Sequence, residues 1–557
     1  MTAKKLLALV LALVLCVGVL SACKQEPAET KPAETKPAET KPAETKPAET
    51  QPTETEPAAP LLNKDLYPIS SEHTFKILTT RADIEKTTNW HMMVDTIGLD
   101  VEWVSMTNEQ VPLTFIDENS MPDIYFQPGG LTAQQINEFG KSGLLVNYAD
   151  YLELMPNLQA WIDEFPNFLD SVVQEDGAFY MLPGYSGGLT APGNLFYIRL
   201  DHTTEAGWET LPTTIEEFLV MCEDLKNYNK DVEGYVPMVC NGAASIAWNG
   251  AYCNFFFPAF GELMRSDITV NADATKIEIG FATEQFKNYL AFMHELYEKG
   301  YMDPDCFVAD SNTSKAKLID EKTTMNPFAT YLTPENFESG KMDFQVMPPL
   351  SSQYQSEARW TSPNRWVVRQ YMINAKCPDI EAAVQFLDAF YAPRENPLNE
   401  EGTIWGIGMW LGEFGKDFIT DEEAGTYVIL DHEGFENGST WLSTVSSGSN
   451  IAQKWDYVEN GGTGLMMKAL GVRDILRPHD VNIFYTTLLM LTDDELETYN
   501  DCWNEIQTKV VEMNAAFITG QADLEADWDT YIDDLYAMGL QDVIDVYQAA
   551  LDRYNAR

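Results

Sequence analysis

The stretch TFKILTTRADIEKTTNWHMMVDTIGLDVEWVSM, residues 74–106, decides the fold class of this chain. Residues 74–80 form a short apolar run of the kind that makes a buried strand. A helical pattern spans residues 83–97, and a second strand-like run follows at 100–106. A third strand-like run, at residues 122–126, comes after another short helix. This β-α-β series predicts a mostly parallel sheet covered by helices, so the first part of the globular region belongs to the α/β class.

Helical patterns dominate the later part of the chain. Thr214 and Glu217 have the spacing of a capping box at the start of a helix. Apolar residues recur at helical spacing within 286–297, 380–390 and 528–554. We interpret these stripes as the buried faces of helices, and we expect the C-terminal region to be helical.

The N-terminal residues have the layout of an export signal. Lys4 and Lys5 precede an apolar run at residues 6–20, which is shorter than the ~20 residues that a membrane-spanning helix needs. The run ends at LSAC, which resembles the lipobox of bacterial lipoproteins. That resemblance implies that Cys23 becomes the N-terminus and carries acyl chains such as palmitate. The alternative is an ordinary secretory cleavage in which Cys23 has no role.

Residues 1–23 are therefore expected to be a lipoprotein signal peptide ending at the lipobox cysteine. Residues 24–60 follow as a low-complexity tract in which KPAET occurs four times in a row from residue 31 to residue 50. A proline in every fifth position blocks helix formation and favours an extended, disordered linker. We expect the protein to be held on the extracellular face of the cell membrane by its lipid anchor.

The globular part is large and strongly acidic. About 500 residues follow the linker, enough for at least two domains. The chain carries 36 Lys and Arg against 86 Asp and Glu, a formal net charge of −50, and its first 60 residues are nearly neutral. Such a field excludes a nucleic-acid partner and disfavours polyanionic ligands such as uronate chains. Neutral and cationic solutes stay open, and the charge is also compatible with a simple solubility adaptation.

Six cysteines follow Cys23, and they contain no Cys-x-x-Cys pair. A large core does not need disulfides, so we interpret them as buried thiols. They are Cys222, Cys240, Cys253, Cys306, Cys377 and Cys502.

Several phrases of the chain are characteristic of one family. They are AQQINEFGKSGLLVNYADYL, FKNYLAFMHELYEKGYMDP, FQVMPPL, YMINAKCPDIEAAVQFLDAF and the tail FITGQADLEADWDTYIDDLYAMGLQDVIDVYQAALDRYN. Together they resemble the extracellular solute-binding proteins of bacterial ABC importers, and most closely the large lipoprotein type of family 1 that serves sugar uptake. The resemblance implies a periplasmic-binding-protein-like type II fold, in which two α/β lobes are joined by a hinge and followed by a helical C-terminal region.

The resemblance also implies a division into lobes. Lobe one is expected at residues 61–190 plus 371–470, and lobe two at 191–370 plus 471–557. In this family the chain crosses between the lobes more than once. The segments Leu182–Tyr197 and Ser362–Asn374 are the expected crossings.

The function implied by the resemblance is transport without chemistry. A carbohydrate, in particular an oligosaccharide, would be captured in the cleft between the lobes and delivered to the permease subunits of the importer. The protein would be a monomer, would not be an enzyme and would need no cofactor. Aromatic platforms with polar groups at their margins suit the apolar faces and hydroxyl edges of sugars. The candidates in the expected hinge and cleft loops are Tyr185, Trp248, Arg359, Trp360, Arg365, Trp366, Trp405 and Trp410.

A calcium site is not expected. Many relatives carry a loop of alternating Asp and Asn after the helix that ends here near Leu225, where this chain reads NYNKDVEGYVPM. The calcium pattern needs a glycine at its sixth position and a bidentate glutamate at its twelfth, and no register of this loop has both. We therefore assign no metal ligand.

Two rival functions stay open. A lipid-anchored glycoside hydrolase is the first, because Gly184–Gly188 match the G-x-S-x-G nucleophile elbow. Pro192 and Gly193 follow too closely for the helix that this motif requires, which favours a hinge loop. The six histidines form no zinc-binding motif, and no catalytic residue is assigned. The second rival is a binding protein for peptides or cationic metabolites, which the acidic surface would suit.

Overall fold

The structure of the protein is a computed structural model. It describes residues 61–556 except 81–83, 118–119, 175, 187–194, 241–250, 262, 264–266, 328–342, 362–365, 422–425, 436–440, 442–444, 446–451, 454–457, 460–471, 482–483 and 485. The chain divides into two units, Met1–Ala59 and Pro60–Arg557, and all described residues belong to the second. The expected signal peptide, Cys23 and the linker lie outside the described residues.

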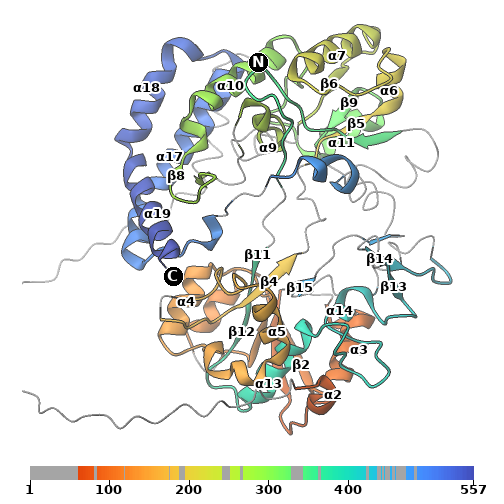
Figure 1. Ribbon diagram of the computed structural model, residues 1–557, viewed down its shortest axis with the longest axis vertical. Coiled ribbons are helices and arrows are strands. Elements are labelled where there is room, and N and C mark those ends of the chain that lie inside the picture. The colour runs from red at the N-terminus through yellow and green to blue at the C-terminus, as the bar shows by residue number, and fades with distance from the viewer. Residues whose placement is uncertain are drawn as a thin grey trace, which may run out of the picture. The chain divides into compact units, whose positions relative to one another are not determined.

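A four-stranded sheet forms the centre of the first hydrophobic core (Figure 1). Its strands are β1 (Phe75–Thr79), β2 (Val101–Ser105), β3 (Ile124–Phe126) and β12 (Tyr371–Ile373), in the order β12-β3-β1-β2. β1 pairs in parallel with β2 and β3, and β12 joins β3 in the antiparallel direction. The three strands predicted from the sequence are confirmed, and a segment far along the chain completes their sheet.

The helix predicted at residues 83–97 forms in two parts, a 3-10 turn at Ile84–Lys86 and helix α3 (Thr88–Ile97). α3 ends at Gly98, which has a φ of +85°. A Cβ atom at this position would lie 2.5 Å from Cβ of Pro68. Both the left-handed backbone and the close approach therefore require glycine where the chain turns from α3 towards β2.

Further helices and a small sheet complete the first core, whose buried side chains come from residues 67–185 and 371–441. The helices are α2 (Asn63–Leu66), α4 (Ala133–Lys141), α5 (Pro156–Glu164), α13 (Ile380–Asp388) and α14 (Gly408–Leu411). The strands of the small sheet are β13 (Phe418–Asp421), β14 (Thr426–Ile429) and β16 (Val458–Glu459).

The second core has its own four-stranded sheet, and its buried side chains come from residues 196–350 and 489–551. The strands are β5 (Tyr197–Arg199), β6 (Val236–Met238), β9 (Thr323–Asn326) and β10 (Phe344–Val346), in the order β10-β5-β9-β6. Its helices are α6 (Leu200–Glu205), α7 (Ile215–Tyr228), α9 (Ala251–Phe256), α10 (Glu284–Glu298) and α11 (Ser311–Ile319). A hairpin is formed by β7 (Thr269–Val270) and β8 (Ile277–Glu278).

Three helices end the chain, α17 (Asp493–Thr519), α18 (Leu524–Ala537) and α19 (Leu540–Asn555), as expected for a helical C-terminal region (Figure 1). α17 packs against α10 and α19. It begins with a complete capping box, in which Thr492 and Glu495 satisfy each other's backbone N–H groups.

The capping box predicted for α7 is only half formed. The Thr214 hydroxyl accepts a hydrogen bond from the Glu217 backbone N–H at 3.1 Å. The Glu217 carboxylate, however, accepts from the backbone N–H of Thr213 rather than from that of Thr214, at 2.9 Å. The helix start is thus capped one residue further out than the box predicts.

The six cysteines are free thiols, as predicted. Five of them are buried, and Cys502 is partly exposed. Burial raises the pKa of the Cys222 thiol well above its ordinary value. Among the described helices, none is both long and apolar enough to cross a membrane.

A buried carboxylate joins two helices of the first core. Asp388, the last residue of α13, is fully buried beneath the first turn of α5. Its carboxylate accepts hydrogen bonds from the Leu158 N–H at 2.8 Å, from the Asn157 N–H at 3.2 Å and from the Asn157 side chain at 2.8 Å. Asp388 therefore satisfies two backbone donors that the start of α5 leaves without helical partners.

We expect the titration of Asp388 to make stability depend on pH. Burial raises the pKa of this carboxyl to about 7, although the hydrogen bonds from Leu158 and Asn157 oppose the rise. The folded state then holds a proton that the unfolded chain has already lost above pH ~4, so this contribution to stability falls as the pH rises from about 4 to 7.

The variant Asp388→Asn tests this expectation, because it cannot titrate. Urea unfolding of both proteins between pH 4.5 and 8 should give a wild-type advantage in unfolding free energy that decreases with pH. An advantage that grows with pH would mean that the hydrogen bonds to the carboxylate outweigh its burial.

Candidate functional site

The chain passes between the two cores three times. β4 (Leu182–Ser186) leaves the first core, β11 (Trp366–Arg369) returns to it, and β15 (Ala452–Gln453) lies on the third passage. The three strands form one sheet of order β11-β4-β15, with β4 antiparallel to β11 and parallel to β15. The two segments expected to cross, 182–197 and 362–374, are thus held together by backbone hydrogen bonds. We call β4, β11 and β15 the crossing sheet.

Tyr185 lies in the crossing sheet, where its backbone pairs with Trp366 of β11 and Ala452 of β15. The residue is 8% exposed. The ring stacks on Phe165 with centroids 4.8 Å apart and lies 5.7 Å from the ring of Trp161 at the end of α5. Aromatic packing therefore fixes the side chain of β4 against the first core.

Two polar contacts strengthen the same cluster. The Trp161 indole N–H donates to the Tyr391 carbonyl at 3.0 Å. The Tyr391 hydroxyl, which is buried, donates in turn to the carbonyl of Pro183 in β4. Burial raises the pKa of this hydroxyl well above its ordinary value. Tyr391 therefore ties the end of α13 and its following turn directly to the backbone of the crossing sheet.

Arg359 and Trp360 anchor the return passage at its second-core end. Trp360 is buried. Its backbone N–H donates to the His479 carbonyl at 2.9 Å, and its backbone carbonyl accepts from the Val481 N–H at 2.8 Å. The Arg359 guanidinium donates to the Gly261 carbonyl at 3.4 Å. The second and third passages therefore lie side by side at this end, whereas β4 separates them in the crossing sheet.

Trp405 and Trp410 belong to the first core. Trp405 is 5% exposed, and its ring packs 5.2 Å from Phe414 and 5.3 Å from Phe418. Trp410 is partly buried, and its ring meets Tyr427 edge to face at 6.3 Å. Both tryptophans thus hold the loop around α14 onto the small sheet.

The structure brings together only some of the predicted ligand residues. Tyr185 and Trp366 face each other in register, although the side chain of Trp366 lies outside the described part of the chain. Trp248 and Arg365 lie wholly outside the described residues. The ligand-binding role of the predicted set stays a prediction.

Sequence reasoning missed the aromatic partners of the crossing sheet, Trp161, Phe165 and Tyr391. Trp161 and Phe165 fall at the end of a helix, and Tyr391 falls after another, so their pattern indicates core positions. Nothing in the sequence places them beside β4.

The nucleophile-elbow match does not have the required geometry at its serine. In that motif the serine occupies a sharp turn between a strand and a helix. Here Ser186 is the last residue of β4, and its backbone pairs with Gln453 of β15. Residues 187–194, where the helix would have to begin, lie outside the described part.

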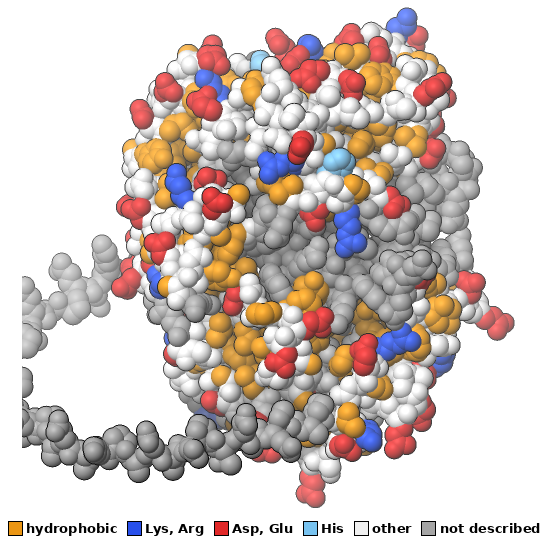
Figure 2. Space-filling model, in the orientation of Figure 1, with side chains coloured by type: hydrophobic (Ala, Val, Ile, Leu, Met, Phe, Trp, Pro, Cys, Tyr) orange, Lys and Arg blue, Asp and Glu red, His pale blue; other side chains and the backbone are white. Residues whose placement is uncertain are grey.

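The visible surface of the molecule is rich in acidic side chains. Figure 2 shows acidic side chains spread over the visible face, with few basic ones among them.

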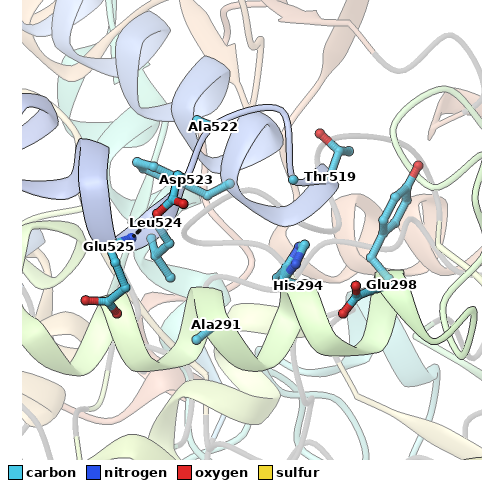
Figure 3. A pocket seen from close by; sticks show the side chains of 11 residues that line it. Ala291, His294, Glu298, Thr519, Ala522, Asp523, Leu524 and Glu525 are labelled. Atoms are coloured by element: carbon cyan, nitrogen blue, oxygen red, sulfur yellow. Dashed lines mark hydrogen bonds between the residues drawn. The ribbon is translucent and has the colours of Figure 1, made fainter.

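A cavity of about 720 Å³ lies where α10 faces the turn between α17 and α18, with His294, Glu298, Asp523 and Glu525 in its lining (Figure 3). A smaller one of about 470 Å³ follows β5 and includes Trp208 and Asp343. None of the predicted ligand residues that the structure describes lines either cavity. In the described residues no group of three or more His, Cys, Asp or Glu is arranged to hold a metal ion.

Comparison with known proteins bears on the class of the molecule. No family model matches the chain. A fructooligosaccharide ABC transporter substrate-binding protein, FusA of Streptococcus pneumoniae serotype 4, is 21% identical over 514 residues, covering 88% of this chain and 92% of the relative.

Solved structures agree with the sequence match. An EF-hand mutant of FusA in complex with fructo-nystose is 19% identical with a TM-score of 0.67, covering 87% of this chain and 100% of that one. An HMO-binding solute-binding protein of Bifidobacterium longum infantis is 15% identical with a TM-score of 0.68, covering 87% and 99%. The alginate-binding protein AlgQ2 is 16% identical with a TM-score of 0.62, covering 86% and 98%.

The fold is therefore that of the type II periplasmic-binding-like solute-binding proteins, as predicted. The predicted resemblance to the substrate-binding proteins of sugar ABC transporters is also confirmed. The relatives are described as binding proteins of transporters, which agrees with the expectation that this chain is not an enzyme.

The hydrogen bond between Tyr391 and β4 predicts that removal of the Tyr391 hydroxyl lowers the stability of the protein. In Tyr391→Phe the ring packing is kept, but the buried Pro183 carbonyl loses its donor, so the free energy of unfolding should fall by about 1–3 kcal/mol. Urea unfolding monitored by tryptophan fluorescence measures this loss.

Tyr151→Phe is the matched control. Tyr151 is partly buried against the same core, and its hydroxyl makes no hydrogen bond within the described residues. Its removal should cost less than about 0.5 kcal/mol. Equal losses in the two variants would contradict the assigned role of Tyr391.

Proposed function

We propose that the protein is the substrate-binding component of an ABC importer that captures an oligosaccharide between two lobes and delivers it to permease subunits in the membrane. One observation carries the proposal. The chain matches an oligosaccharide-binding transporter protein along nearly its whole length, and it has the corresponding two-core fold. No catalytic step is needed, because the solute is released unchanged.

The lobes are proposed to be the bodies that surround the two cores. Lobe one comprises residues 61–190 and 371–470, and lobe two comprises 191–370 and 471–557. Separate cores support this division, because each body can move without breaking its own packing. The crossing sheet is the proposed hinge.

Closure around the solute is a population shift. The closed arrangement gains population only by the contacts that the ligand makes there and not in the open one. A hinge made of paired strands suits this motion, because backbone hydrogen bonds keep the crossings together while small dihedral changes add up along them. The molecule is proposed to act as a monomer.

The ligand residues are proposed to be those selected from the sequence. Tyr185 and Trp366 sit in register on the crossing sheet, and Arg359 and Trp360 lie on the passage that leads into β11. Arg365 directly precedes β11 in the sequence, and Trp248 comes from the segment 241–250. Tyr185, Trp405 and Trp410 are weaker members, because their rings already pack in the first core.

The proposed anchor is a lipid on Cys23. The small residues Ser21 and Ala22 behind an apolar run support cleavage at this point, and two or more acyl chains hold a protein stably on a bilayer. The following linker would let the binding protein stand off from the extracellular face of the membrane while staying near its permease.

A ligand screen tests the proposed function. Neutral oligosaccharides, uronates, short peptides and polyamines are added separately, and thermal unfolding is recorded. A saccharide at a hundredfold excess over its dissociation constant should stabilise the protein by about 2.7 kcal/mol. Stabilisation by peptides or polyamines alone would favour the rival binding function, and hydrolysis of an added glycoside would favour the enzyme.

Trp366→Ala is the matched variant for the screen. Loss of a stacking platform should weaken saccharide binding about tenfold. The midpoint of unfolding without ligand serves as the control for folding. An unchanged saccharide affinity would remove Trp366 from the proposed site.

Cys23→Ser tests the anchor. In cells, the wild-type protein should fractionate with membranes, whereas the variant should be released to the medium or to the soluble fraction. Immunoblotting of the fractions measures the distribution. Retention of Cys23→Ser in the membrane fraction would contradict lipid anchoring through this residue.

A further inference from the structure

A second connection joins the two cores beside the crossing sheet. The hydroxyl of Tyr554, at the end of α19, donates to the Asp170 carboxylate at 2.8 Å and accepts from the Asn167 side chain at 3.3 Å. Asn167 and Asp170 lie in the loop between α5 and β4, and α19 belongs to the second core. This contact is thus made by side chains rather than by a passage of the chain.

The end of α19 is held firmly within the second core. Arg553 makes a bidentate ion pair with Glu495 of α17, with both N–O distances at 2.6 Å. The Asn555 side chain donates to the Ala274 carbonyl of the β7–β8 hairpin at 2.7 Å. The Tyr554 ring also packs edge to face on Phe484, 5.0 Å away. Its hydroxyl is therefore presented to the other core from a fixed position.

The loop that carries Asn167 and Asp170 also contacts the crossing sheet. Phe165 and Phe168 belong to the same loop as Asn167 and Asp170. Phe165 stacks on Tyr185 of β4 at 4.8 Å, and Phe168 packs on Trp161 at 5.5 Å. One face of this loop therefore touches the proposed hinge, while its other face bonds to α19.

We propose that Tyr554 is a positioning residue for lobe closure, and that its bond to Asp170 favours the arrangement of the two lobes in which this contact is made. The inference rests on the proposed function. A hydrogen bond loses its strength within a few tenths of an ångström and a few tens of degrees, so rotation of one lobe against the other breaks it. The contact therefore lowers the free energy of one arrangement only, and it shifts the population towards that arrangement.

Tyr554→Phe tests the proposal, because it removes the hydroxyl and keeps the ring on Phe484. Spin labels are placed at two exposed positions, Ser142 after α4 and Val220 on α7, by Ser142→Cys and Val220→Cys. The full chain carries Cys16→Ser, Cys23→Ser and Cys502→Ser, so that the other native cysteines are the five buried ones and labelling is confined to the introduced pair. Pulsed electron resonance then gives the distribution of distances between the lobes without ligand. We expect the variant to have a shifted distribution and the parent to resemble the arrangement described here.

The affinity for the stabilising saccharide is a second measurement. The direction in which it changes must match the direction of the shift in the distance distribution. If the distribution in Tyr554→Phe moves towards that of the ligand-bound parent, the affinity should rise, and if it moves away, the affinity should fall, by about three- to tenfold in either case. Opposite signs would overturn the proposal. Because the distance measurement needs no ligand, it stays decisive even if no saccharide binds and the proposed function fails.

Partner variants separate this role from a general effect on folding. Asp170→Ala should reproduce the shift, the double variant should add nothing further, and Asp170→Asn, which keeps an acceptor oxygen, should restore part of the parental distribution. Tyr536→Phe, at an exposed position on α18, is the control and should leave the distribution unchanged. Identical distributions in the parent, Tyr554→Phe and Asp170→Ala would overturn the proposal.

Discussion

The antiparallel pairing of β4 with β11 is the constraint on which the rest of this structure depends. Each strand belongs to a different passage between the two cores, and their four registered residue pairs keep those passages together. Without this pairing the second passage would be independent of the other two, which β4 and β15 join, and the axis of motion between the cores would be less well defined. The pairing also fixes which residues of the two passages lie opposite each other, as Tyr185 and Trp366 do.

The crossing sheet in turn depends on the packing of the first core. Trp161, Phe165 and Tyr391 hold β4 by ring contacts and by a hydrogen bond to its backbone. Asp388 fixes the start of α5, the helix that carries Trp161, through three hydrogen bonds. A buried carboxylate is costly unless its partners are well placed, and here they are supplied by backbone donors at a helix start that have no helical partner. The position of the crossing sheet is therefore set by polar and aromatic contacts together.

A binding protein of this fold needs both rigidity and a small free-energy difference between its arrangements. Two separate cores provide the rigidity, because closure leaves each of them intact. Contacts such as that between Tyr554 and Asp170 change the free-energy difference between the arrangements. They join the two cores from outside, so they can be made in one arrangement and lost in another. In the proposed function the solute would then need only modest contacts to shift the population, which suits binding followed by release.

The sequence by itself determined the local structure and the class of the fold. The strands at residues 74–80, 100–106 and 122–126 were predictable because each is a short buried run between helical patterns, and the tail was recognisable by its helical stripes. Tertiary structure alone decided the position of β12 in the first sheet, the pairing of β4 with β11 and the partners of Tyr185. These features join segments far apart in the chain, and periodicity reports only which face of an element is buried, not what covers it. For the same reason the sequence did not show that the rings of Trp405 and Trp410, which it suggested as ligand candidates, pack in the first core.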